Sequence, residues 1–140
     1  MLKPGGEILF YFPVAANTFQ LYKVLDEQGK WQFLRDYEMY CSPYKDSTNP
    51  KDELKIFLNK KGYKILSLNI DEKRYKFPLQ YVQKLQQILI PLPVPDQLSG
   101  EILKAAVPAL RSLNFIGMDE NGTEYYDFIY NLAILYAVRI

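Results

Sequence analysis

The stretch that decides the fold is LKPGGEILFYFPV, residues 2–14. The proline fixes φ and the glycine pair permits a sharp reversal, so LKPGG predicts a turn. The eight residues that follow, 7–14, predict a strand, and the run 8–13 is apolar without alternation. Because a strand with only one covered face alternates apolar and polar residues, both faces of this strand are expected to be covered. That pattern is typical of a central strand in an α/β sheet.

Two further strands are predicted, and they differ from one another. Residues 63–71, YKILSLNID, carry Leu66, Leu68 and Ile70 on one face and polar residues on the other, which favours an edge strand. Residues 128–139, FIYNLAILYAVR, are apolar on both faces, which favours a second central strand. A self-contained sheet of three strands has two edges and one centre. The patterns therefore predict that a neighbouring strand is missing on one side.

Between the predicted strands, the spacing of apolar residues and the capping residues predict helices. One helix is expected to begin after Asn17 as N-cap, and a short one covers residues 31–39. The clearest helix has Asn49 as N-cap and Pro50 at its first position, and it ends at Gly62.

The last third of the chain also reads as helical before its final strand. Pro78 opens a helix whose apolar stripe is Val82, Leu85, Ile88 and Leu89. Asp96 is expected to cap a longer helix that reaches Leu113, and Pro108 is expected to kink or split it.

Composition limits the classes of function. The 140 residues correspond to one domain, and a net charge of +1 argues against an electrostatic nucleic-acid binder. The absence of histidine removes Ser-His and Cys-His catalysis and nearly every zinc site, so no metal is expected. The single cysteine, Cys41, cannot form an internal disulfide, and no apolar run is long enough for a membrane span. With no leader sequence expected, a cytoplasmic location is predicted.

Several of these motifs together resemble a known family. LKPGG before an apolar strand is similar to the turn entering the fifth strand of class I S-adenosylmethionine-dependent methyltransferases, and NKKGYKILSL is similar to their entry into the sixth. The stretches LYKVL, KWQFLRDYEMYCSPY and RYKFP narrow the resemblance to the juvenile hormone acid O-methyltransferase branch of arthropods. The resemblance covers essentially the whole chain and is looser after Pro91.

The resemblance implies an α/β fold that is the C-terminal part of a seven-stranded Rossmann-like sheet, with strands in the order five, seven, six. Residues 1–77 would hold the end of the core sheet and its helices, residues 78–125 a helical cap over the substrate, and residues 126–140 the final antiparallel strand. The family's glycine-rich cofactor loop follows its first strand, and no such loop follows any strand here. The chain is therefore expected to be the C-terminal half of a methyltransferase, inactive alone and without cofactor-binding residues.

The reaction implied by the resemblance is methyl transfer from S-adenosylmethionine to a carboxylate. An ionised carboxylate is already the nucleophile, so the enzyme needs no catalytic base and no catalytic residue is assigned. The implied substrate is a small apolar acid of the juvenile hormone acid or farnesoic acid type. The residues placed by the resemblance in the substrate pocket are Trp31, Tyr40, Ser42 and Tyr44.

A plainer interpretation stands beside each candidate. Trp31 is equally compatible with a core position, Tyr40 and Tyr44 with loop packing, and Ser42 before a proline with turn chemistry. Cys41 is expected to be a small buried hydrophobe. A second hypothesis for the whole chain is a non-enzymatic short protein that keeps the substrate-side half as a binding or partner-docking module. A reading frame that continues upstream of Met1 would exclude it.

Overall fold

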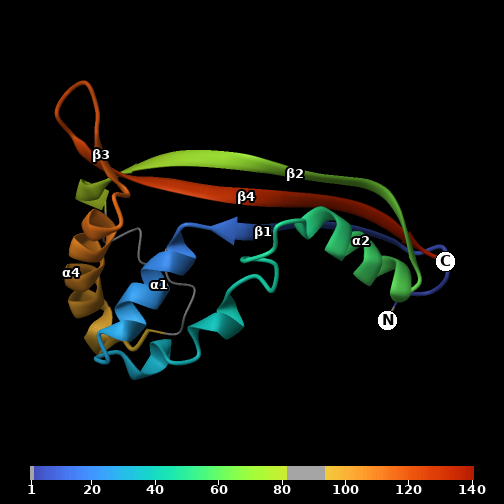
Figure 1. The fold of residues 1–140 in the computed structure, drawn as a ribbon, viewed down its shortest axis with the longest axis horizontal. Helices are drawn as coiled ribbons and strands as arrows, with labels where there is room; N and C mark the ends of the chain where they lie inside the picture. Colours follow the sequence, from blue (N-terminus) through green and yellow to red (C-terminus); the bar gives the residue numbers. More distant parts are fainter. Residues whose placement is uncertain (1, 82–93) are drawn as a thin grey trace. The chain divides into compact units, whose positions relative to one another are not determined.

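The computed structural model describes residues 2–81 and 94–140, and these form a sheet with helices (Figure 1). The three long strands are β1 (Glu7–Ala16), β2 (Tyr63–Pro78) and β4 (Glu124–Arg139), and their order in the sheet is β1-β4-β2. The predicted order, with the last strand between the other two, is confirmed. A short strand that the sequence analysis missed, β3 (Ile116–Met118), pairs antiparallel with the start of β4.

Backbone hydrogen bonds fix the direction of the central strand. The amide of Gly5 donates to the carbonyl of Arg139 at 2.8 Å, so the beginning of β1 lies beside the end of β4. The amide of Ile140 donates to the carbonyl of Gly62 at 2.9 Å, which places the beginning of β2 beside the same end. β4 therefore runs antiparallel to both neighbours, as the ribbon also shows (Figure 1).

Helix α2 (Pro50–Lys60) follows the sequence expectation closely. The side chain of Asn49 accepts a hydrogen bond from the amide of Asp52, which satisfies one of the amides that a helix leaves free at its start. The chain leaves the helix through Gly62, whose φ of +79° is a conformation that glycine adopts without a Cβ penalty. Local capping signals alone predict this helix correctly.

Elsewhere the helix predictions need correction. Residues 31–39 form no helix but two short 3₁₀ turns, η1 (Gln32–Leu34) and η2 (Tyr37–Tyr40). The helix predicted from Pro78 falls largely on residues 82–93, outside the described residues; before them lies a 3₁₀ turn, η3 (Leu79–Tyr81).

Helix α4 (Asp96–Ser112) differs from its expectation in two respects. Its N-cap residue is Pro95, and Asp96 is the first helical residue rather than the cap. The helix also continues through Pro108 instead of splitting there. Burial of Ile102 and Leu110 on either side of the proline explains this, because tertiary packing of an apolar face outweighs the local cost of a missing hydrogen bond.

The described chain divides into two compact units, each with its own core. Unit 1 comprises residues 1–15, 42–73 and 130–140, and its buried core is Leu54, Leu58, Leu68, Leu135 and Ala137. Unit 2 comprises residues 16–41 and 74–129. Its core includes α1 (Thr18–Glu27), α4 and the start of β4, with the fully buried side chains Leu21, Leu25, Leu34, Ile102 and Tyr126.

The burial of β1 contradicts the expectation of two covered faces. Three consecutive side chains in it are largely exposed: Leu9 at 68%, Phe10 at 54% and Tyr11 at 77%. Among the described residues the strand lies at one end of the sheet order, which agrees with the prediction that a neighbouring strand is missing on one side. β2 lies at the other end, so its prediction as an edge strand is confirmed. The apolar run in β1 therefore has more hydrophobic surface than the described chain covers.

Candidate functional site

Trp31 lies in the core of unit 2, with 6% of its surface exposed. Its ring lies near that of Phe33, with centroids 6.3 Å apart, and its neighbours in the core are otherwise aliphatic and aromatic. Among the described residues its buried indole nitrogen Nε1 has no hydrogen-bond partner. A buried indole N–H normally has a partner, so this donor is available to an acceptor that enters the core. The predicted contact of Trp31 with substrate stays a prediction.

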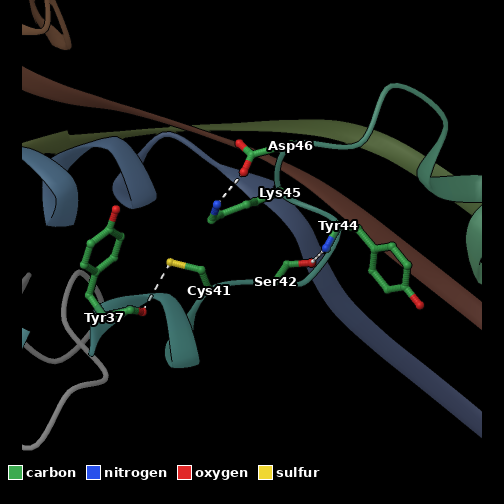
Figure 2. A network of polar contacts seen from close by, with 6 residues as sticks. All are labelled: Tyr37, Cys41, Ser42, Tyr44, Lys45 and Asp46. Carbon is green, nitrogen blue, oxygen red and sulfur yellow. Dashed lines mark hydrogen bonds and ion pairs between the residues drawn. The ribbon is translucent and has the colours of Figure 1, made fainter. Parts of the chain in front are cut away.

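The other three predicted pocket residues lie in different surroundings. Tyr40 is 46% exposed at the end of η2 in unit 2. Ser42 and Tyr44 belong to unit 1, where the Ser42 Oγ accepts a hydrogen bond from the amide of Tyr44 at 3.2 Å (Figure 2). This is the turn chemistry that the plainer interpretation of Ser42 anticipated. The Tyr44 ring packs against the core of unit 1, and partial burial, followed by the nearby Glu53, raises the pKa of its hydroxyl.

Cys41 is buried, as expected for a small apolar side chain. Its thiol donates to the carbonyl of Tyr37 at 3.5 Å, one turn earlier in the chain (Figure 2). A thiol is reactive as the thiolate, which needs an adjacent positive group or base. The contact described here is to a neutral carbonyl, which does not favour the thiolate.

Asn17 was expected to cap the first helix, and the expectation that its side chain does so is wrong. It makes no side-chain cap for α1. Its Oδ1 accepts hydrogen bonds from the hydroxyl of Tyr126 at 2.7 Å and from the amide of Ile129 at 3.2 Å. Its Nδ2 donates to the carbonyl of Asp127 at 2.7 Å. Asn17 therefore joins the carboxyl end of β1 to the first half of β4.

This position is the usual location of sites in α/β folds. Ligands of open α/β sheets bind beyond the carboxyl ends of the strands, and Asn17 directly follows β1. Tyr22, Trp31 and Tyr126 belong to one core cluster in unit 2, and Asn17 is hydrogen-bonded to the last of them. We call these four residues the β1-end cluster. No short-range pattern could reveal it, because Asn17 and Tyr126 are 109 residues apart.

Electrostatics keep the two tyrosines of the β1-end cluster neutral. Burial, followed by the nearby Cys41, raises the pKa of Tyr22 far above its ordinary value. Burial, followed by Tyr22 and Asp127, does the same for the pKa of Tyr126. Both phenols can donate hydrogen bonds but cannot act as bases near neutral pH. The Tyr126 hydroxyl already donates to Asn17, and none of the four side chains of the cluster is suited to remove a proton near neutral pH.

The glycines of the described chain do not form a cofactor cradle. Gly5, Gly29, Gly62 and Gly122 have positive φ and lie in separate turns, with open space where a Cβ would be. At Gly117 a Cβ would meet the Tyr125 ring at 2.6 Å, so the chain's own side chain occupies that approach. A nucleotide cradle needs glycines clustered where a strand enters a helix. The residues described here therefore do not fit S-adenosylmethionine by themselves.

None of the helices in residues 2–81 and 94–140 is long and apolar enough to cross a membrane. Within the same ranges no group of three metal-ligating side chains is assembled.

Comparison with known proteins gives two relatives and no matching family model. The chain is 26% identical over 144 residues to a juvenile hormone acid O-methyltransferase of Drosophila melanogaster, a match that covers 98% of this chain and 48% of that protein. It is 21% identical over 145 residues to the juvenile hormone acid O-methyltransferase of Bombyx mori, covering 100% of this chain and 52% of that protein. The chain thus spans about half the length of the curated relatives it matches. The resemblance to this methyltransferase branch is confirmed.

Proposed function

We propose that this chain is the substrate-side half of an S-adenosylmethionine-dependent O-methyltransferase that esterifies a small apolar carboxylic acid. The observation that carries the proposal is the match to two juvenile hormone acid O-methyltransferases over essentially the whole chain. Acids of the juvenile hormone or farnesoic type are the proposed substrates. Since the chain spans about half of each relative, the remaining half of the parent enzyme would hold the cofactor.

The side chains of unit 2 support the proposal that this half of the enzyme binds the substrate. Its core is built from aliphatic and aromatic side chains, and the β1-end cluster adds two phenols that stay neutral. An apolar acid needs such surroundings, with a few polar groups for orientation. Because an ionised carboxylate carries no proton to remove, the lack of a base in the cluster is compatible with ester formation. The chain's contribution is to bind the acid, hold it in one orientation and exclude water.

The sheet supports the proposed place of the chain in the parent fold. In that fold β1 would be the fifth strand, β4 the seventh and β2 the sixth, with residues 78–125 as a helical cap over the substrate. The observed order β1-β4-β2 and the antiparallel direction of β4 agree with this assignment. We further propose that the parent enzyme is cytoplasmic.

The proposal is tested by expressing the complete product of the gene and supplying it with methyl-labelled S-adenosylmethionine and a series of acids. The expected product is a labelled methyl ester of a long apolar acid such as farnesoic acid, with acetate giving none. The 140-residue chain alone is expected to form no ester. Transfer of label only to a non-carboxylate acceptor, or to no acceptor, would contradict the proposal.

A further inference from the structure

Five basic side chains lie at one end of unit 1, where the beginnings of β1 and β2 meet the ends of α2 and β4 (Figure 1). The amide of Gly5 donates to the carbonyl of Arg139, and the amide of Ile140 donates to that of Gly62, so these segments are adjacent. Four of the five side chains are exposed, and that of Arg139 is partly buried. We call them the basic end; they are Lys3, Lys60, Lys61, Lys64 and Arg139.

Little negative charge opposes the basic end. Residues 2–7, 56–66 and 136–140 contain one acidic side chain, Glu7, which accepts a hydrogen bond from the hydroxyl of Tyr136. The whole chain has a net charge of +1, so its positive charge is concentrated at this end of unit 1. Such a local excess attracts an anionic surface even where the molecule as a whole is nearly neutral.

Exposed apolar side chains adjoin these cations on α2. Ile56 is 55% exposed and Phe57 is 49% exposed, although the helix already buries two leucines in the core of unit 1. Phe57 precedes Lys60 and Lys61 by three and four residues, so the three side chains are neighbours on the last turn. The ammonium of Lys61 lies 5.8 Å from the centre of the Phe57 ring. The end of α2 therefore presents apolar and cationic groups together.

The same combination recurs at the start of β2. The guanidinium of Arg139 lies 5.7 Å from the centre of the Tyr63 ring, and Lys64 follows Tyr63 in the strand. Aromatic rings are enriched where the hydrocarbon of a membrane meets the lipid head groups. Lysine and arginine suit the same layer, because their stems are apolar and their ends are charged. The side chains at this end of unit 1 are therefore those that a lipid interface accommodates.

We propose that the basic end and the adjoining Ile56 and Phe57 bind a membrane surface that contains anionic lipids. The five cations face the phosphate groups of the lipids, and the two apolar side chains enter the layer below the head groups. The cytoplasmic leaflet is the negatively charged one, so this peripheral contact agrees with the proposed cytoplasmic enzyme. Under the proposed function it would hold the enzyme where a long apolar acid accumulates. The membrane contact itself is independent of that function.

An acidic polymer, such as a nucleic acid or an acidic protein segment, fits this surface less well. It pairs with the cations but leaves Ile56 and Phe57 without an apolar partner, whereas a lipid interface accepts both kinds of side chain. The two occupants therefore differ in how strongly binding depends on the two apolar side chains.

The test measures binding of the complete product of the gene to vesicles by co-sedimentation. Vesicles of phosphatidylcholine alone are compared with vesicles in which about one-third of the lipid is phosphatidylserine. Binding is expected only to the second kind. It should weaken as the salt concentration rises from about 0.1 M to about 1 M, because the screening length falls from about 10 Å to about 3 Å.

Two lysines of the basic end are then replaced. Lys60→Gln/Lys61→Gln is expected to lower the partition coefficient at least about tenfold, since each lysine near an anionic surface contributes about fivefold. The matched control, Lys23→Gln/Lys30→Gln, removes two exposed lysines of unit 2 and should leave the partition coefficient unchanged.

A second variant, Ile56→Gln/Phe57→Gln, distinguishes a membrane from an acidic polymer. It keeps every charge, and the loss of two apolar side chains from the interface is expected to lower the partition coefficient at least about fivefold. All the substituted side chains are exposed, so each variant should keep the thermal midpoint of the unsubstituted protein to within about 2 °C.

Three results would overturn the proposal. The first is the absence of binding to phosphatidylserine vesicles at low salt. The second is a loss of binding in Lys23→Gln/Lys30→Gln as large as that in Lys60→Gln/Lys61→Gln. The third is unchanged binding of Ile56→Gln/Phe57→Gln, which would identify the basic end as a surface for an acidic polymer. Methyl transfer is measured separately and without vesicles, so a product that binds vesicles but methylates no acid refutes only the proposed function.

Discussion

The hydroxyl of Tyr126 donates a hydrogen bond of 2.7 Å to the side-chain oxygen of Asn17, and both groups are buried. The two residues lie at opposite ends of the chain, one after β1 and one near the start of β4. The same Asn17 side chain holds two backbone groups of β4, the amide of Ile129 and the carbonyl of Asp127. One side-chain amide therefore bonds three polar groups of β4.

Loss of this amide should destabilise the fold. Asn17→Ala would leave the Tyr126 hydroxyl buried without a partner, and each such orphaned group costs about 1–3 kcal/mol. We expect the free energy of unfolding to fall by at least about 2 kcal/mol in a urea titration. Asn69→Ala, at an exposed position of β2, is the control and should change it by less than about 0.5 kcal/mol.

The coupling between the two residues is a second test of the same contact. Tyr126→Phe removes the donor but leaves Asn17 bonded to the backbone of β4, so it should cost less than Asn17→Ala. In the double variant the two losses should not add, with a coupling of about 0.5–3 kcal/mol. Strict additivity in the same titration would show that the hydrogen bond contributes nothing.

The start of α2 gives a prediction about pH. The hydrogen bond from the Asn49 side chain, and then the one from Lys55, lower the pKa of Asp52 below its ordinary value. The ionised carboxylate is thus favoured in the folded state. Its contribution to stability is complete above the ordinary pKa and is lost as the pH falls through the lowered one.

Asn49→Ala should therefore move the pKa of Asp52 upward, as measured by NMR titration of its carboxyl carbon. The same change removes the cap of α2 and should lower the free energy of unfolding by about 0.5–2 kcal/mol. Lys55→Met keeps the cap and should raise the pKa of Asp52 by a smaller amount. If the lysine variant moved that pKa more than the asparagine variant, the order of these two causes would be wrong.

Two variants of Trp31 distinguish a role in the core from a role in substrate binding. Truncation to alanine at a site only 6% exposed should cost about 3–5 kcal/mol of stability. Trp31→Phe keeps an aromatic ring but removes the N–H that has no described partner together with part of the ring volume, so it should cost less stability than truncation to alanine.

The kinetics of the complete enzyme then decide whether Trp31 contacts the substrate. If the indole N–H binds an acceptor on the acid, Trp31→Phe raises the KM for the acid by about tenfold, while affinity for the cofactor stays the same. We expect this rise. An unchanged KM in a folded Trp31→Phe enzyme would assign the residue to the core alone.

The absence of a glycine cradle among the described residues leads to a prediction about the chain by itself. Isothermal titration calorimetry of the purified 140-residue chain should show no binding of S-adenosylmethionine. Micromolar affinity would require a cofactor site that the described residues do not show. The complete gene product, titrated under the same conditions, is the positive control.

The sequence predicted well what local chemistry determines. The cap and end of α2 follow from Asn49, Pro50 and Gly62, each of which acts within a few residues of itself. The order of the three long strands was predicted from the resemblance to the methyltransferase family, and the one-sided pattern of β2 agreed with its place at an edge.

What depends on distant contacts could not be predicted. Asparagine is a residue type that often caps helices, but the hydrogen-bond partners of Asn17 lie more than a hundred residues away. No local signal distinguishes an asparagine that caps a helix from one that bonds a distant strand. Residues 31–39 carry apolar side chains at helical spacing, yet they form two 3₁₀ turns around the buried Trp31 and Leu34. Of the four predicted pocket residues, only Trp31 lies in the core of unit 2 and belongs to the β1-end cluster.

The most direct measurement of the central claim is the sequence of the 5′ end of the transcript. If the chain is half of a methyltransferase, the reading frame continues upstream of Met1 and encodes an apolar strand followed by a glycine-rich loop. The added length should be about that of this chain, since the relatives are about twice as long as the match. An in-frame stop codon immediately upstream of Met1 would contradict the account and leave the short binding module as the surviving hypothesis.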